Sequence, residues 1–181
     1  LMNINSGEIL SLISLPDFDI NKRNNISDKM YINRATKGVY EFGSVFKTFT
    51  IAAGFNEKLI EPKDMFNNLE KKIKCGGRTI SEYDENLSQN LSVEEILINS
   101  GNIGSVKIGQ KLGVDKIRNF LNKIGITGNI KFDIAEIGTP IPFNWGKCKL
   151  LTVSFGHGIT TTLLQLCLLY TSDAADDCWS V

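Results

Sequence analysis

A helix that carries a lysine on its apolar face is the strongest structural constraint in this sequence. Apolar residues follow Gly43 with the spacing of a core-facing helix, at positions 45, 46, 49, 52 and 53. We expect this helix to begin at or next to Ser44 and to run to about Glu57. Because residues three apart lie on one face of a helix, the side chains of Ser44 and Lys47 can meet. The chain must therefore build a core that accommodates an amine.

Two interpretations of the Ser44–Lys47 pair remain open from these residues alone. The positive end of a helix favours an alkoxide on Ser44, and the same field, together with apolar neighbours, lowers the pKa of Lys47. A neutral lysine beside a serine can act as its general base. In the simpler interpretation the lysine extends past the core and keeps its ammonium in water. S-x-x-K alone occurs often by chance, so the pair needs support from elsewhere in the chain.

The rest of the chain predicts short strands and longer helices. Residues 1–14 indicate a hairpin that turns at Gly7, and 61–90 indicate an exposed excursion with a turn at Gly76-Gly77. We expect loops and short strands over 126–156. A capping box, formed by a serine and a glutamate three residues later, opens the first of four further helices, expected at 93–99, 103–112, 116–124 and 163–170. This mixture favours an α/β or α+β domain.

Composition excludes several functions. Lys+Arg and Asp+Glu both number 20, so net charge gives no reason to expect nucleic acid as a partner. No apolar run reaches the roughly 18 residues of a membrane span. The cysteines at 75, 148, 167 and 178 lack C-x-x-C spacing. We therefore expect no metal site and favour isolated thiols, although one disulfide remains possible.

A second polar motif, Ser100-Gly101-Asn102, falls between two of the predicted helices. A loop at such a junction can present its side chains to a cleft. Ser100 could relay a proton, and Asn102 could hold a substrate amide through both its donor and its acceptor. Taken alone, the motif is more typical of a helix C-cap turn built from small residues.

Together the two motifs resemble those of the penicillin-recognising serine enzymes, in which S-x-x-K at a helix start is followed by S-x-N at a turn. Four stretches are similar, in order, to the class B penicillin-binding proteins, the peptidoglycan D,D-transpeptidases, and most of all to the cell-division type. The resemblance covers residues 1 to about 170. The stretches are NSGEILSLISLPDFDIN, INRATKGVYEFGSVFK, INSGNIGSVKIGQKLG and SFGHGITTTLLQL.

The resemblance implies a fold, a reaction and four site residues. The fold would be the penicillin-binding-protein/serine β-lactamase-like transpeptidase fold, an antiparallel sheet flanked by helices. Ser44 would be the acylated nucleophile, with its N–H in the oxyanion hole, and Lys47 its base. Ser100 would shuttle the proton and Asn102 would bind the stem peptide. The enzyme would attack a D-alanyl-D-alanine stem and transfer it to an amine of a neighbouring stem, without cofactor or metal, and β-lactams would trap the acyl-enzyme.

The resemblance also implies a cellular context. The expected partners are peptidoglycan stem peptides, β-lactam antibiotics and cell-division membrane proteins. The catalytic domain would face the periplasm, held to the bacterial inner membrane by an anchor that precedes Leu1.

The sequence departs from the family pattern at four positions and lacks one of the family's three motifs. Phe42, Val45, His157 and Thr162 replace the usual proline, threonine, tyrosine and proline, and none removes a catalytic group. His157 is expected to be a structural loop residue. No K-T-G or K-S-G, the family's third motif, occurs in the 181 residues. We expect 1–170 to be a partial transpeptidase domain lacking its C-terminal strands, nearly inert alone, and 171–181 to be a non-native tail.

Two other functions remain possible at this point. A serine β-lactamase shares S-x-x-K and often S-x-N, but it needs a further base, typically in an E-x-x-L-N setting, and no such stretch follows Asn102. A penicillin-binding sensor or division scaffold would keep the fold without the chemistry.

Overall fold

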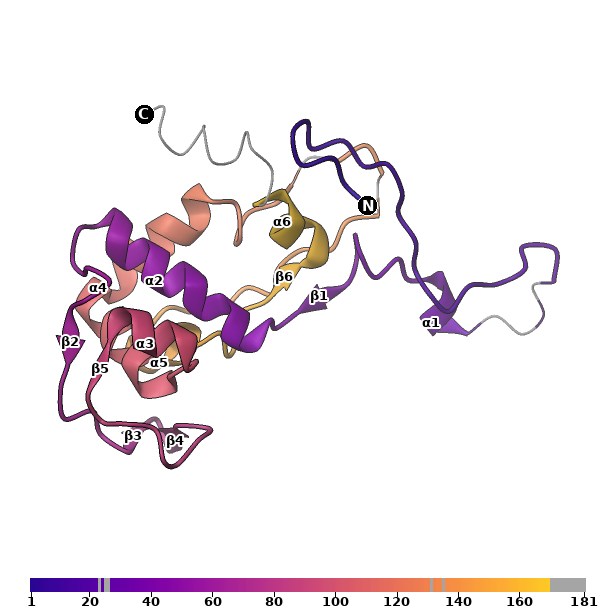
Figure 1. Cartoon of the computed structure of the whole chain (residues 1–181). Coiled ribbons are helices and arrows are strands. Elements are labelled where there is room, and N and C mark those ends of the chain that lie inside the picture. Colours follow the sequence, from indigo (N-terminus) through magenta and orange to yellow (C-terminus); the bar gives the residue numbers. More distant parts are fainter. Residues whose placement is uncertain (23, 25–26, 131, 135, 170–181) are drawn as a thin grey trace. The chain divides into compact units, whose positions relative to one another are not determined.

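The computed structural model describes residues 1–22, 24, 27–130, 132–134 and 136–169 (Figure 1). The expected tail, 171–181, lies outside the described residues. The chain forms two compact units, which are described separately. One comprises Leu1–Tyr40, Asn122–Ile141 and Thr160–Val181, and the other Glu41–Leu121 and Pro142–Ile159.

The second unit contains the predicted lysine helix and most of the other helices. It begins with a 3-10 turn, Gly43–Phe46, that leads directly into α2, Lys47–Asn56, so the predicted start and end are each within a few residues. The other elements are β2 (Met65–Phe66), β3 (Lys72–Cys75), β4 (Arg78–Ser81), β5 (Leu91–Ser92), α3 (Val93–Ile98), α4 (Asn102–Lys123, which continues into the first unit) and α5 (Lys147–Val153).

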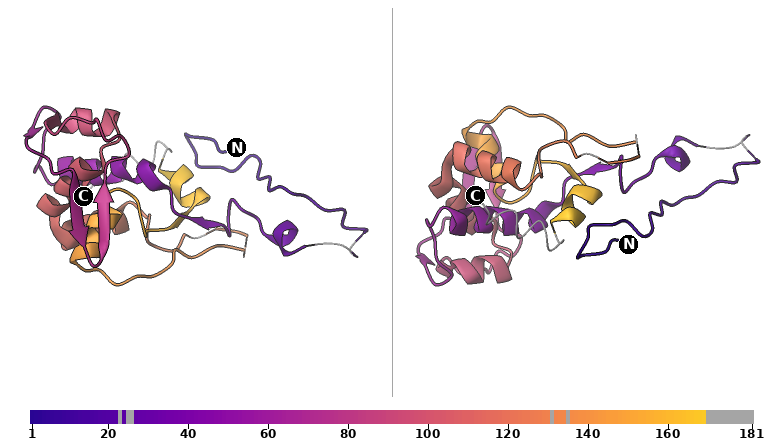
Figure 2. Two further views of the ribbon diagram at one scale, coloured as in Figure 1. Left: turned by 90° about the horizontal axis from the view of Figure 1, so that it is seen from below. Right: turned by 90° about the horizontal axis from the view of Figure 1, so that it is seen from above.

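The core of this unit is formed by aliphatic side chains from α2, α3, α4 and α5. Figures 1 and 2 show these helices gathered together, with the β3–β4 hairpin beside them. The capping box of α3 is present as predicted, since Ser92 Oγ accepts from Glu95 N and Glu95 accepts from Ser92 N. Gly113, with φ of 78°, interrupts α4 where the sequence predicts a break. The most buried core residues include Ile51, Ala53, Val93, Ile96, Ile103, Val106, Ile108 and Leu151.

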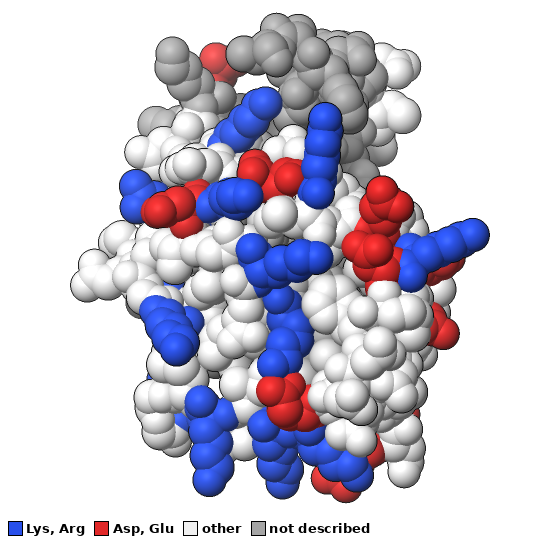
Figure 3. All heavy atoms as spheres, turned by 90° about the vertical axis from the view of Figure 1, so that its left-hand side faces the viewer, with Lys and Arg blue, Asp and Glu red and all other residues white. Residues whose placement is uncertain are grey.

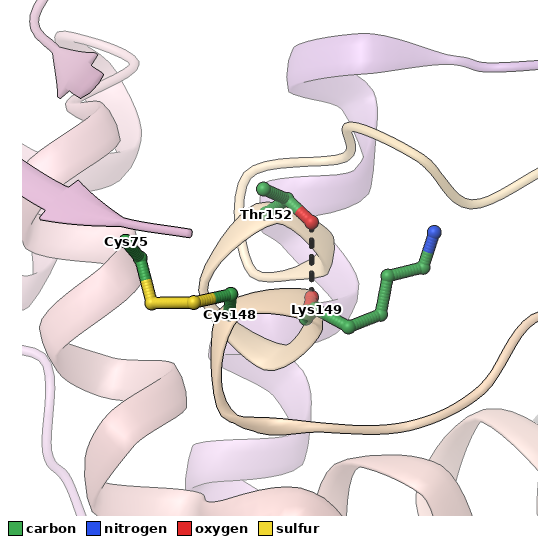
Figure 4. Close-up of a disulfide and its surroundings, with 4 residues drawn as sticks. All are labelled: Cys75, Cys148, Lys149 and Thr152. Atoms are coloured by element: carbon green, nitrogen blue, oxygen red, sulfur yellow. Dashed lines mark hydrogen bonds between the residues drawn. A yellow bond between two sulfur atoms is a disulfide. The ribbon is translucent and has the colours of Figure 1, made fainter. Parts of the chain in front are cut away.

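The β3–β4 hairpin gives the predicted excursion an ordered structure. Gly76 and Gly77 have φ of 57° and 76°, so both central residues of the turn are left-handed, as in a type I′ hairpin. The hairpin is fixed by a disulfide from Cys75, at the end of β3, to Cys148, in the first turn of α5 (Figure 4). The preference for isolated thiols is therefore wrong for Cys75 and Cys148, which form a disulfide, whereas Cys167 is free and exposed.

Helix α5 corrects the prediction of loops and short strands over 126–156. The helix begins after Gly146, which is extended, and buries Leu150, Leu151 and Val153. Its seven residues include β-branched and glycine-flanked positions that locally disfavour a helix, but the burial of one apolar face outweighs that preference. No strand occurs among the described residues of this range.

The first unit has fewer regular elements. Its α1 spans Asp28–Tyr31, and β1 (Val39–Tyr40) pairs antiparallel with β6 (Thr161–Thr162). The expected N-terminal hairpin is reduced to one bridge, between Met2 and Ile9. Helix α6 (Leu163–Leu168) begins where predicted, with a capping box between Thr162 and Gln165.

The described part of the chain has the mixed helix and antiparallel-strand character expected from the sequence, with three two-stranded antiparallel sheets. None of the helices in this part is both long and apolar enough to cross a membrane. On the face drawn in Figure 3, basic side chains have acidic ones between them. Lys107 and Glu70 form an ion pair at 2.7 Å.

Candidate active site

Ser44, Lys47, Ser100 and Asn102, the four residues singled out in the sequence, line one pocket of about 590 Å³ in the second unit. The 3-10 turn and α2 supply the first two, the turn after α3 supplies Ser100, and Asn102 is the first residue of α4. The remaining lining residues are Glu41, Gly43, Glu82, Tyr83, Asp84, Leu87, Asn99, Phe155, Gly156 and His157.

Lys47 points into the protein and not into water. Its side chain is only 1% exposed, and Nζ donates to Ser100 Oγ at 2.9 Å and to the Ser100 carbonyl oxygen. Burial lowers the pKa of Lys47 from 10.5 to about 8, although the negative charge of Glu82 acts to raise it. The interpretation of a lysine whose ammonium lies in water is therefore wrong. Among the described residues, the hydrogen bonds of Nζ go to Ser100 and none goes to Ser44.

Ser100 occupies a backbone conformation that usually belongs to glycine. Its φ is 53°, and it follows α3 in a Schellman motif, in which Ser100 N donates to Leu97 O and Gly101 N donates to Ile96 O. A left-handed conformation costs a residue with a Cβ roughly 1 kcal/mol. The predicted C-cap turn is thus present, and its strained serine contacts the buried amine.

Replacing Ser100 by glycine and by alanine separates backbone strain from the loss of the hydroxyl. Both variants lose the Oγ bond to Lys47, but only glycine relieves the left-handed strain. Ser100→Gly is therefore expected to exceed Ser100→Ala in free energy of unfolding by about 1 kcal/mol. Urea denaturation of the two variants measures this difference. Equal stabilities would contradict the strained conformation.

Asn102 is fixed by the end of β4. Its Nδ2 donates to Ser81 O at 2.8 Å, and its backbone N donates to Glu82 Oε2. The next backbone N–H, that of Ile103, donates to Glu82 Oε1 at 2.8 Å. Sequence reasoning missed Glu82. The only signal was that Gly101, before the helix, has no side chain to cap α4, and no local pattern identifies a partner twenty residues away.

The segment that contributes Gly156 to the pocket depends on a close backbone approach to Gly43. Gly156 has φ of 85°, and a Cβ there would lie 1.8 Å from Gly43 O, so only glycine fits. Thr50 Oγ1, on α2, donates to Ser154 O at 2.9 Å and holds this segment.

His157 Nδ1 lies 3.2 Å from Glu41 Oε2, and its side chain is about half exposed. Among the described residues, no group of three His, Cys, Asp or Glu side chains could hold a metal ion.

Solved structures with a similar chain arrangement identify the fold. The transpeptidase domain of penicillin-binding protein 3 from Burkholderia pseudomallei matches 77% of this chain and 43% of its own, with a TM-score of 0.70 and 24% identity. A peptidoglycan synthetase from Bifidobacterium adolescentis matches 77% of this chain and 26% of its own, with a TM-score of 0.67 and 26% identity. The expected transpeptidase fold is confirmed.

The sequence family follows from the family model. The model of the penicillin binding protein transpeptidase domain matches residues 1–176. The chain belongs to this family, and the resemblance to class B penicillin-binding proteins is confirmed.

Relatives with curated names agree with this assignment. The probable peptidoglycan D,D-transpeptidase FtsI of Caulobacter vibrioides is 33% identical over 165 residues, which are 91% of this chain and 28% of the relative. Stage V sporulation protein D of Bacillus subtilis is 30% identical over 178 residues, which are 91% of this chain and 26% of the relative. The chain thus spans between a quarter and a third of the length of these two relatives.

Proposed function

We propose that this chain is the part of a peptidoglycan D,D-transpeptidase that carries the serine nucleophile. The observation that carries the proposal is a buried lysine, Lys47, hydrogen-bonded to Ser100 in the pocket that Ser44 also lines. A buried amine with a pKa of about 8 is partly neutral near physiological pH and can accept a proton. The names of the relatives supply the substrate class.

The first half of the reaction forms an acyl-enzyme. Lys47 Nζ takes the hydroxyl proton of Ser44 as Oγ attacks the carbonyl carbon of the D-alanyl-D-alanine bond. The Ser44 N–H stabilises the oxyanion. The proton then passes from Lys47 through the Ser100 hydroxyl, 2.9 Å away, to the nitrogen of the leaving D-alanine. The carbon–nitrogen bond breaks and the stem remains esterified to Ser44.

The second half transfers the stem. An amine of a neighbouring stem attacks the ester, loses a proton to Lys47, and forms the new amide as Ser44 leaves with a proton. A β-lactam would follow the first half only. Its ring opens without releasing a fragment, so the acyl-enzyme persists.

Asn102 would hold the stem peptide. Its Nδ2 is used by Ser81 O, which fixes the side chain so that its carbonyl oxygen can accept from a peptide N–H. This role follows from the family pattern and from the position of Asn102 in the pocket.

Turnover of a D-alanyl-D-alanine pentapeptide tests the proposal. With the gene product that contains this chain, we expect release of D-alanine and, when an amine acceptor is added, formation of a new amide. With a β-lactam we expect one equivalent bound and no sustained hydrolysis. Sustained hydrolysis would favour a serine β-lactamase, and an absence of both reactions would favour a non-catalytic penicillin-binding sensor or scaffold.

We also propose that the gene product works at the bacterial inner membrane, with this domain in the periplasm and cell-division membrane proteins as partners. Stem peptides are extracytoplasmic, and the name FtsI among the relatives suggests division. Cell fractionation and protease protection test the location. A gene product confined to the cytoplasm would refute it.

The rate of acylation is expected to rise with pH through a midpoint of about 8. The pKa of Lys47 is lowered to about 8, so the amine is mainly protonated below this pH and mainly free above it. Second-order rates of acylation by a penicillin, measured from pH 6 to 9.5, report this pKa for the free enzyme. A rate that is flat or falls across this range would contradict a neutral Lys47 as base.

A further inference from the structure

The turn that carries Ser100 and Asn102 is held by a carboxylate from outside the two motifs. Glu82 follows β4 directly, and its two carboxylate oxygens accept from the backbone N–H groups of Asn102 and Ile103. These are the first two residues of α4, where N–H groups lack partners within the helix. Because Gly101 has no side chain, Glu82 supplies the cap that the local sequence lacks.

Glu82 also lines the pocket that contains the buried amine of Lys47. Its negative charge acts to raise the pKa of that amine, against the larger lowering by burial. The adjoining Ser81 adds a third bond to the turn by accepting from Asn102 Nδ2. The end of β4 thus contacts the turn through a backbone carbonyl and a carboxylate. The disulfide at the other end of the hairpin joins it to α5.

We propose that Glu82 is a positioning residue of the active site, which fixes the Ser100–Asn102 turn through its two bonds to α4 and places a carboxylate in the pocket that Lys47 lines. The inference rests on the proposed function for its catalytic meaning. The helix cap and the effect of the Glu82 charge on Lys47 can both be measured without any catalysis.

Several other groups could influence the same amine. The pocket residues contributed by α3, α4 and the turn between them are uncharged, so charge reaches Lys47 from other segments. The titratable side chains that line the pocket with Lys47 are Glu41, Glu82, Tyr83, Asp84 and His157. Of these, Glu82 is the one that contacts α4 and the one whose charge acts on Lys47.

Glu82→Gln and Glu82→Asp test the proposal in the gene product that contains this chain. Glutamine offers one oxygen to two N–H groups and no charge, whereas aspartate keeps the charge on a shorter side chain. Glu94→Gln, at an exposed position in the first turn of α3, is the matched control.

Two readouts do not depend on activity. Hydrogen exchange, followed by mass spectrometry, is expected to be roughly five-fold faster over 102–106 in Glu82→Gln, as for a lost helix cap. The pH midpoint for acetylation of Lys47 by acetic anhydride is expected to fall by about one pH unit in Glu82→Gln and to stay near the wild-type value in Glu82→Asp. If Glu82 had only a structural role, the loss of its charge would not lower this midpoint.

The outcomes separate the two proposals. Unchanged exchange and an unchanged Lys47 midpoint in Glu82→Gln would overturn the inference, whether or not the protein is acylated. If both change as expected and the wild type is acylated, acylation should be at least about ten-fold slower in Glu82→Gln and partly restored in Glu82→Asp. If Glu82→Gln shows both changes but the wild type is not acylated, the proposed function is contradicted and the positioning role of Glu82 is still supported.

Discussion

Replacing Lys47 by methionine is expected to slow acylation by a penicillin by about 10³–10⁴-fold. General-base catalysis by a positioned side chain contributes about 10²–10⁴ in rate, and the loss of the bond to Ser100 also interrupts the route of the proton. Methionine has a similar length and suits a site where the side chain is 1% exposed, so the fold should persist. The measurement is the second-order rate of labelling by a fluorescent penicillin, with circular dichroism to confirm folding.

Lys107→Met is the matched control for this prediction. Lys107 is also a helical lysine, but it is partly exposed, lies more than one turn beyond Asn102 on α4, and pairs with Glu70. Its substitution should leave the labelling rate unchanged, because an exposed ion pair contributes little. A folded Lys47→Met protein that is labelled at the wild-type rate would rule out Lys47 as the base.

Removing the Cys75–Cys148 disulfide is expected to cost about 4 kcal/mol of unfolding free energy. The two cysteines are 73 residues apart, and the loss of loop-closure entropy in the unfolded chain grows with that separation. For a domain of this size the thermal midpoint should fall by roughly 8–16 °C. Thermal unfolding of the Cys75→Ala/Cys148→Ala protein measures the effect.

The exposed free thiol provides the control for the disulfide. Cys167→Ala should leave the thermal midpoint within about one degree of the wild type, because it breaks no cross-link. A reducing agent should lower the midpoint of the wild type and leave that of the double variant unchanged. If the double variant has the same thermal midpoint as the wild type, the disulfide does not form in the native protein.

Local sequence rules predicted the elements whose signals are short-range. The apolar stripe located α2, and the pairing of Ser92 with Glu95 located the start of α3. Gly76-Gly77 located a turn because only glycine readily adopts two successive left-handed conformations. The four candidate site residues were identified in the same way, since each motif is local and the resemblance supplied their relation to each other.

Features that depend on distant contacts could not be predicted in this way. Helix α5 forms because Leu150, Leu151 and Val153 find a buried surface, which local propensity does not report. The partner of Cys75 and the role of Glu82 depend on which segments the fold brings together. Ser100 breaks the local preference for glycine at a helix C-cap, and such exceptions are expected where a side chain is needed for function.

The central claim is that Ser44 is the acylated nucleophile, activated by a buried Lys47. The most direct test is to incubate the gene product that contains this chain with a fluorescent penicillin, digest it, and locate the label by mass spectrometry, with Ser44→Ala beside it. We predict one label per protein, on Ser44, and none on the variant. A label on any other residue, or equal labelling of Ser44→Ala, would contradict the claim.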